Sequence, residues 1–428
     1  MRAVLRVFVL SLTFVGSSVA FPALVLSKEK DSVPGAAGCP FAAARQSQAG
    51  GKRQLVTFDP VKQKIDVSGK HAFQPPGPGD QRVAALVQAL ANHNFISHNG
   101  ITTLLEATTA SNKIFGFGID LAAAAAACGV IFGGNPVTQV FSIGGPPPGL
   151  VIPPLISRPP GLSGTHNRFE GDASPTRGDA YTHNGDPSLL DLDSFRHLYD
   201  LVQEGSSGNF DTSVLTDHRA WTRQNDWIVG YRNPHFFVSP LGTLILSTLT
   251  HMLIPRCFSN HSEEFPAGYL NHDNLKSFFA VSGDRQNFVY QQGYEKIPDN
   301  WYRRPDDYTI PLLLADFVAM SLKYPEFLSL GGNTGQVNSF AGLDLGDLTG
   351  GVFNSANLLQ GKNLVCFVFQ AVQGGIPGVL DGVASTALGI LNLGIFNDNI
   401  KPLLADCPAL SQYNVAAFQA YPGASGAV

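Results

Sequence analysis

The segment 169–177 carries the side chains in this chain that are best suited to binding a metal ion. It contains two carboxylates, Glu170 and Asp172, and the hydroxyl group of Ser174. Carboxylate and hydroxyl oxygens suit a hard cation such as Mg²⁺, which takes oxygen ligands in near-octahedral geometry. Gly171 lets the backbone come close, so that a carbonyl oxygen can join the ligands. The same pattern also occurs in solvated turns that cap helices, so the spacing alone leaves both interpretations open.

His251 is a second candidate for chemistry, because it is the only strongly polar side chain in the apolar segment 244–254. Imidazole titrates near neutral pH and therefore suits proton transfer. A buried, hydrogen-bonded core histidine is the alternative interpretation of this pattern.

The N-terminus predicts secretion. Residues 1–20 contain Arg2 and Arg6, an apolar core and small residues that end at Ala20, which is the pattern of a cleaved signal peptide. A buried N-terminal helix is the alternative, and the apolar run is too short to span a membrane. Asn260 begins a glycosylation sequon, which fits a secreted chain. Secretion permits disulfides, and an odd number of cysteines leaves at least one thiol outside them. The cysteines are Cys39, Cys128, Cys257, Cys366 and Cys407.

Composition predicts one large domain and excludes nucleic acid as a partner. Removal of residues 1–20 takes away two arginines and no acid, so the formal net charge of −5 becomes −7, and no basic patch attracts phosphates. Hydrophobic residues make up 44% of the chain and charged residues 14%, which permits a large core. Because we find no linker, we expect one domain over residues 55–415, after a leader segment 21–54 and before a flexible tail 416–428.

Apolar residues recur at helical spacing along much of the chain, and no segment alternates cleanly as a strand would. We therefore predict a mainly α fold, a single large helical domain with long loops. The expected helices include 83–94, 112–132, 188–204, 211–231, 273–281, 310–324 and much of 353–410. The motifs of serine hydrolases, zinc proteases and nucleotide-binding enzymes are absent from the sequence.

The acidic stretch reads Glu-Gly-Asp-Ala-Ser-Pro-Thr-Arg, which resembles the signature of fungal heme-thiolate peroxidases, the chloroperoxidase and unspecific peroxygenase family. The resemblance implies a chloroperoxidase-like domain that binds heme b. It also implies a secreted enzyme that uses H₂O₂ to oxidise a halide or to insert oxygen into small organic substrates. Further motifs that resemble the family lie in order at 71–82, 91–100, 142–145, 178–180, 275–279, 297–304, 323–327 and 331–335.

The resemblance also implies roles for individual residues. In the family the acidic motif holds Mg²⁺ beside a heme propionate. This implies that the Glu170 carboxylate, the Gly171 carbonyl and the Ser174 hydroxyl are Mg²⁺ ligands here. The separation of Cys366 and Cys407 resembles that of a C-terminal disulfide in peroxygenase relatives.

The axial heme ligand of the family is missing from its expected place. In the family a Pro-Cys-Pro turn supplies a thiolate, which favours cleavage of the O–O bond. Here Ala84 stands about where that cysteine belongs, and alanine cannot ligate iron. Three explanations are open: a degenerate relative, an incorrectly joined gene model, or a ligand from elsewhere, with Cys39 as the candidate.

The proton-transfer residue also departs from the family, in which a distal glutamate moves the proton between the peroxide oxygens. Alignment on neighbouring motifs puts this region at 246–252, which contains no glutamate and leaves His251 as the nearby titratable side chain. Glu263 and Glu264 lie further along and fit a charged loop. The sequence therefore predicts a secreted heme-thiolate peroxidase. The alternative is a catalytically degenerate relative that keeps the fold and the Mg²⁺ site.

Overall fold

The computed structural model describes residues 57–81, 86–135, 138–147, 159, 161–164, 175–178, 188–230, 234, 237–238, 248–328, 331–337, 339–374, 405–410 and 414–422. The predicted signal peptide and leader segment lie outside these residues, as do Ala84 and the three expected Mg²⁺ ligands.

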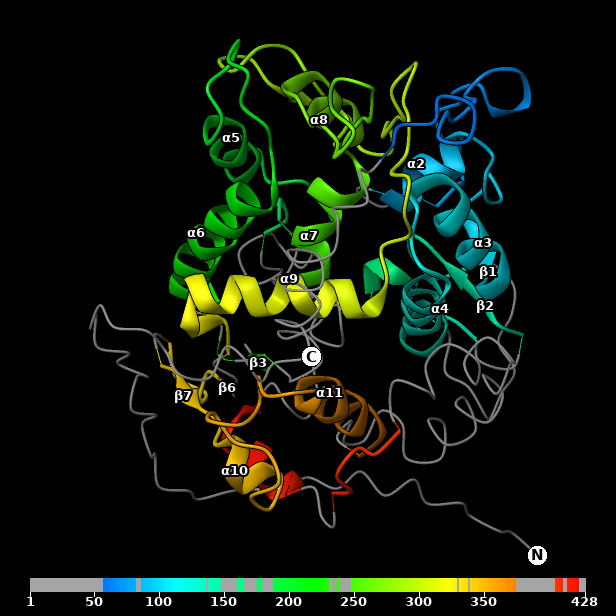
Figure 1. The fold of residues 1–428 in the computed structure, drawn as a ribbon. Helices are drawn as coiled ribbons and strands as arrows, with labels where there is room; N and C mark the ends of the chain where they lie inside the picture. Colours follow the sequence, from blue (N-terminus) through cyan, green and yellow to red (C-terminus); the bar gives the residue numbers. More distant parts are fainter. Residues whose placement is uncertain are drawn as a thin grey trace, which may run out of the picture.

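Helices dominate the described residues (Figure 1). The strands are only two or three residues long, so the predicted mainly α fold is confirmed. No helix in this part of the chain is long and apolar enough to cross a membrane. The α-helices are α2 (Leu86–Asn92), α3 (Leu104–Phe115), α4 (Ile119–Cys128), α5 (Leu192–Asp200), α6 (Thr212–Gly230), α7 (Thr248–Cys257), α8 (His272–Phe278), α9 (Ile310–Lys323), α10 (Leu345–Leu348) and α11 (Asn363–Gly374).

The strands form three small antiparallel sheets. β1 pairs with β2 in a register that places Ile101 opposite Ser142. β3 pairs with β6 and β6 with β7, and β4 pairs with β5. The strands are β1 (Ile101–Thr103), β2 (Val140–Ser142), β3 (Phe237–Val238), β4 (Val281–Ser282), β5 (Val289–Tyr290), β6 (Gly331–Gly332) and β7 (Ala341–Gly342).

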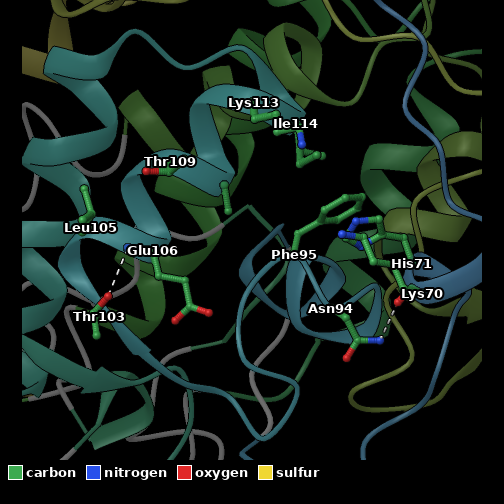
Figure 2. Close-up of a pocket in the computed structure, with 11 residues that line it drawn as sticks. Lys70, His71, Asn94, Phe95, Thr103, Leu105, Glu106, Thr109, Lys113 and Ile114 are labelled. Carbon is green, nitrogen blue, oxygen red and sulfur yellow. Dashed lines mark hydrogen bonds between the residues drawn. The ribbon is translucent and has the colours of Figure 1, made fainter.

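Helix α3 begins and ends at residues suited to those positions. Thr103 precedes it, and the Thr103 Oγ1 accepts a hydrogen bond from the backbone N–H of Glu106 at 3.1 Å (Figure 2), which is N-cap geometry. Gly116 ends it with a left-handed φ of 68°, which glycine adopts without a Cβ clash.

The prediction of one helix over 112–132 is wrong, because this glycine divides it. The chain ends α3 at Phe115 and begins α4 at Ile119. The backbone N–H of Tyr308 donates to the Gly116 carbonyl, and the N–H of Gly118 donates to the Tyr308 carbonyl, both at 2.7 Å. These two bonds satisfy backbone groups that a continuous helix would have paired internally.

Helix α9 lies between two hydrophobic cores. Leu313 and Met320 belong to the larger core, which is built mainly from α2–α8. Leu314 and Phe317 belong to a smaller C-terminal core with α10 and α11. Figure 1 shows α9 crossing the molecule between α6 and α7 on one side and α10 and α11 on the other.

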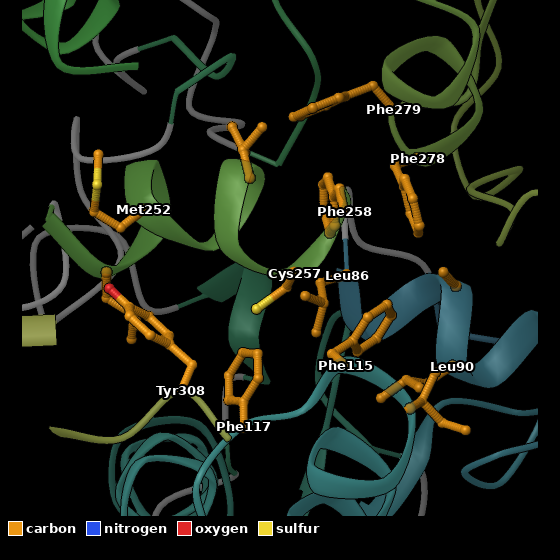
Figure 3. Packing of buried hydrophobic residues seen from close by; sticks show 14 of the residues in the cluster. Leu86, Leu90, Phe115, Phe117, Met252, Cys257, Phe258, Phe278, Phe279 and Tyr308 are labelled. Atoms are coloured by element: carbon orange, nitrogen blue, oxygen red, sulfur yellow. The ribbon is translucent and has the colours of Figure 1, made fainter. Parts of the chain in front are cut away.

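The larger core is rich in aromatic rings near the end of α7. Phe258 stacks on Phe278 with centroids 4.1 Å apart, and Phe115 meets Trp301 edge-on at 5.9 Å. Figure 3 shows Cys257 among the apolar side chains of this region. Such offset and edge-on ring contacts stabilise a core beyond simple burial, and they fix α7 against α3 and α8.

The first part of the expected flexible tail 416–428, up to residue 422, is ordered against the smaller core. Val415–Ala420 form a short 3₁₀-helix. Phe418 and Tyr421 are 5% and 4% exposed and pack in the smaller core. Burial of two aromatic side chains accounts for this ordered segment.

Candidate functional site

Three histidines from three helices meet in the interior. His197 lies on α5 and is half-buried, whereas His218 on α6 and His251 on α7 are fully buried. The ring centroids of His197 and His218 are 5.2 Å apart, and those of His218 and His251 are 6.1 Å apart. We call these three residues the histidine cluster. The Trp221 ring stacks on His197 at 3.9 Å and covers one side of the cluster.

Local sequence explains why α5 faces the cluster. Asp191 caps this helix, since its Oδ1 accepts hydrogen bonds from the backbone N–H groups of Asp193 and Ser194. Ser194 and His197 are three residues apart, so they lie on the same face of the helix. That face is the one that meets α6.

The histidine cluster contacts Pro175, near the end of the acidic stretch. The Pro175 carbonyl oxygen lies 2.6 Å from the His218 Nε2 and 2.8 Å from the Ser194 Oγ, and both groups donate to it. The next residue is also held, because the Thr176 carbonyl accepts from the Asp191 N–H at 2.8 Å. The exit of the acidic stretch is therefore fixed to α5 and α6.

The hydrogen bonds assign the ring protons of the cluster. A carbonyl oxygen only accepts, so the His218 Nε2 carries a proton. The Nδ1 atoms of His197 and His218 are 3.0 Å apart, so one donates and the other accepts; with both rings neutral, His197 donates. Burial lowers the pKa of His218 to about 3 and also lowers the pKa of His197. Both rings are therefore neutral at neutral pH.

The predicted metal ligands Glu170, Gly171 and Ser174 lie outside the described residues. Within the described ranges, no group of three or more histidine, cysteine, aspartate or glutamate side chains is placed to hold a metal ion. What the structure adds is the anchor at Pro175, one residue after Ser174.

The structure places His251 within the histidine cluster and gives α7 no carboxylate. The sequence of α7 is Thr-Leu-Thr-His-Met-Leu-Ile-Pro-Arg-Cys. Glu263 and Glu264 are exposed, as expected for a charged loop. His251 is therefore the one imidazole on α7, and its ring lies beside that of His218, which contacts Pro175.

Two thiols lie among the described residues and outside the disulfide. Cys257 is buried at the end of α7, and Cys128 lies at the end of α4. Burial raises the pKa of Cys257 to about 12 and that of Cys128 to about 11. Burial therefore disfavours the thiolate form at both residues in the absence of a metal.

Two other predicted features lie within the described residues. Cys366 and Cys407 form a disulfide with an S–S distance of 2.04 Å. Asn260, the sequon residue, is partly exposed, and its Oδ1 accepts a hydrogen bond from the Tyr302 N–H at 2.8 Å.

Sequence reasoning missed His197, His218 and Trp221. All three stand in segments that were predicted as helices, but helical periodicity does not reveal which polar side chains meet across a helix interface. The available signal was weak: His218 and Trp221 are three residues apart, so they lie on one face of α6.

Comparisons with known proteins identify the family of the chain. The family model described as "Peroxidase, family 2" matches residues 71–306. An aromatic peroxidase of Fusarium equiseti, fscJ, is 40% identical over 370 residues, which cover 84% of this chain and 83% of the relative. A dothistromin biosynthesis peroxidase of Dothistroma septosporum, dotB, is 38% identical over 386 residues, 87% of this chain and 89% of the relative. An aromatic peroxygenase of Cyclocybe aegerita is 27% identical over 291 residues, 61% of this chain and 72% of the relative. With a family match over more than half of its length and relatives that span most of it, the chain belongs to peroxidase family 2, the fungal heme-thiolate peroxidases.

Proposed function

We propose that this protein is a secreted enzyme that uses H₂O₂ to oxidise small aromatic molecules by oxygen insertion, with halogenation as the other reaction of the same class. The observation that carries the proposal is 40% identity, over more than four fifths of both chains, to a protein named an aromatic peroxidase. The likeness to an aromatic peroxygenase supports oxygen insertion.

Heme is the cofactor that family membership suggests, and the cysteines limit where a thiolate ligand can come from. Burial raises the pKa of Cys128 and of Cys257, and Cys366 is joined to Cys407. Cys39 is the remaining cysteine of the five. The axial ligand is left unassigned: its expected position is near Ala84, and Cys39 is the substitute candidate.

A catalytically degenerate relative is the second candidate function. Two features favour it: Ala84 stands about where the resemblance places the axial cysteine, and α7 contains no glutamate. Such a protein would keep the fold and the Mg²⁺ loop and would lack thiolate-heme chemistry.

The Mg²⁺ site of the proposal consists of the Glu170 carboxylate, the Gly171 carbonyl and the Ser174 hydroxyl. Support comes from the anchor that follows them, because a loop tied at Pro175 to two helices holds its ligands in place at less entropic cost. Asn260 is the proposed glycan site.

His251 is the proposed acid–base residue, which moves a proton between the two oxygens of the peroxide. Replacing a positioned proton-transfer group typically costs about 10²-fold to 10⁴-fold in rate. We expect His251→Ala to lower kcat/KM for H₂O₂ by at least about 10²-fold and to alter its pH profile. The matched control is His98→Ala, a half-buried histidine outside the cluster.

The experiment measures peroxide-dependent oxidation of a phenol by the secreted full-length protein, with both variants checked for an unchanged melting temperature. Turnover that requires H₂O₂ supports the enzyme. Absence of turnover in the parent protein favours the degenerate relative. Equal loss in both histidine variants would remove His251 from the mechanism.

A further inference from the structure

A pocket of about 440 Å³ lies between α3 and the residues that follow the C-terminal end of α2 (Figure 2). One wall comes from the 3₁₀-helix Gly69–His71 and from the residues just after α2, including Phe95. The other wall is a face of α3. This volume lies within the range of small-molecule sites, about 300–1,000 Å³.

The first wall is preorganised by its own hydrogen bonds. The His71 Nδ1 donates to the His93 carbonyl, and the His93 Nδ1 donates to the His71 carbonyl, both at 2.7 Å. The Asn94 Nδ2 donates to the Lys70 carbonyl at 3.2 Å. The Phe95 and His71 rings stack with centroids 4.0 Å apart and an interplanar angle of 21°. A ligand therefore meets a fixed pair of rings.

The second wall presents one face of a helix. Glu106, Ala110, Lys113 and Ile114 follow helical spacing on α3, and all line the pocket. Phe95 supplies the accessible apolar surface, since Ile114, which Figure 2 shows beside it, is only 1% exposed. The pocket thus combines an apolar interior with charged groups at its rim.

The rim has more available positive than negative charge. Lys70 and Lys113 are exposed, and neither ammonium group has a hydrogen bond or ion pair with the residues that the structure describes. The Glu106 carboxylate already accepts hydrogen bonds from the Thr102 Oγ1 at 2.8 Å and from the Ser97 Oγ at 3.2 Å. Two lysines without acidic partners are notable on a chain whose formal net charge is −5.

We propose that this pocket binds a small planar aromatic carboxylate. The ring packs against Phe95, and the carboxylate meets the ammonium groups of Lys70 and Lys113. Glu106 favours a monoanion over a phosphate dianion, because a second negative charge adds repulsion from its carboxylate. The site does not depend on peroxidase activity, so its test stands apart from the test of the proposed function.

The test is isothermal titration calorimetry of 2-naphthoate against the secreted full-length protein, with the neutral isostere 2-naphthamide as comparison. We expect saturable 1:1 binding of 2-naphthoate and about tenfold weaker binding of the amide, since exposed ion pairs each contribute modestly. The variant Lys70→Gln/Lys113→Gln should lose about the same factor. Binding should also weaken at high salt.

The matched control is Lys62→Gln, an exposed lysine that pairs with Asp59 away from the pocket and should leave the affinity unchanged. Phe95→Leu, which removes the ring without removing charge, should weaken both naphthyl ligands. Melting temperatures verify that each variant is folded. The proposal is overturned by equal binding of acid and amide, by an unaffected double lysine variant, or by inorganic phosphate that competes as well as 2-naphthoate.

Discussion

The buried imidazole of His218 shows how a single residue fixes both local structure and pH response. Its Nε2 donates to the Pro175 carbonyl, and its Nδ1 faces the Nδ1 of His197. Protonation of His218 would place two N–H groups against each other and would put a charge in the core. Burial is the largest cause of the shift in the pKa of His218, which falls to about 3.

This shift predicts acid destabilisation. The unfolded chain takes up a proton at His218 below a pKa of about 6.5, whereas the folded chain does so only near pH 3. The stability contributed by neutral His218 is therefore complete above about pH 6.5 and is lost as the pH falls toward 3. Within this window one proton changes the free energy of unfolding by about 1.4 kcal/mol per pH unit.

The variant His218→Gln separates this titration from the hydrogen bond. The glutamine amide can still donate to the Pro175 carbonyl but does not titrate. We expect the slope of unfolding free energy against pH to fall by about one proton between pH 4 and 6, measured by urea unfolding. If the free energies of unfolding of variant and parent differ by the same amount at all pH values, the slope is unchanged and the substitution acts through packing alone. That result would contradict the proposed titration.

At the scale of elements, a buried carboxylate joins α7 to α9. Asp316 on α9 accepts from the Arg256 Nε at 2.9 Å and from the Arg256 Nη2 at 2.6 Å. It also accepts from the Tyr308 hydroxyl at 2.8 Å. Tyr308 is fully buried, so this network connects the two helices on the side of the larger core.

Removal of one hydroxyl tests that connection. Tyr308→Phe keeps the ring and deletes a hydrogen bond to a carboxylate, so we expect the free energy of unfolding to fall by about 1.5–3 kcal/mol. Tyr302→Phe is the matched control, because its hydroxyl meets Asn300 at the exposed surface and should cost little. Denaturant unfolding of both variants measures the difference, and equal losses would argue against the network.

The helices show what sequence can predict. The expected segments 211–231 and 310–324 agree closely with α6 and α9, because long apolar stripes and polar flanks define them. Gly116 is visible in the sequence as an interruption of the segment 112–132, but the sequence does not show that one helix ends there, because the turn is held by backbone hydrogen bonds to a distant residue, Tyr308. Contacts of that kind are set by tertiary structure.

The candidate site was predictable only in part, for a similar reason. His251 was identified because it interrupts an apolar run. Its partners His218 and His197 stand on amphipathic helices, where a polar side chain gives no sign of being buried. The acidic stretch was recognised from its motif, whereas the role of Pro175 as an anchor required the structure.

At the scale of the whole molecule, the disulfide closes the C-terminal core. Cys366 and Cys407 are 41 residues apart, and Cys366 is fully buried beside Phe367 in the smaller core. The chain-entropy model gives a loop of this length about 4 kcal/mol of stabilisation. We expect Cys366→Ala/Cys407→Ala to unfold at lower denaturant concentration by an equivalent amount. Reductant should destabilise the parent protein and leave the variant unaffected; equal sensitivity of both would contradict this role.

The central proposal is that this family member is a heme-thiolate enzyme. The most direct test is the absorption spectrum of the secreted full-length protein, reduced and exposed to CO. We predict bound heme with a red-shifted, thiolate-type Soret band, and the Cys39→Ala variant shows whether Cys39 supplies the thiolate. A protein without heme, or a spectrum without thiolate character, would contradict the claim and identify a degenerate relative.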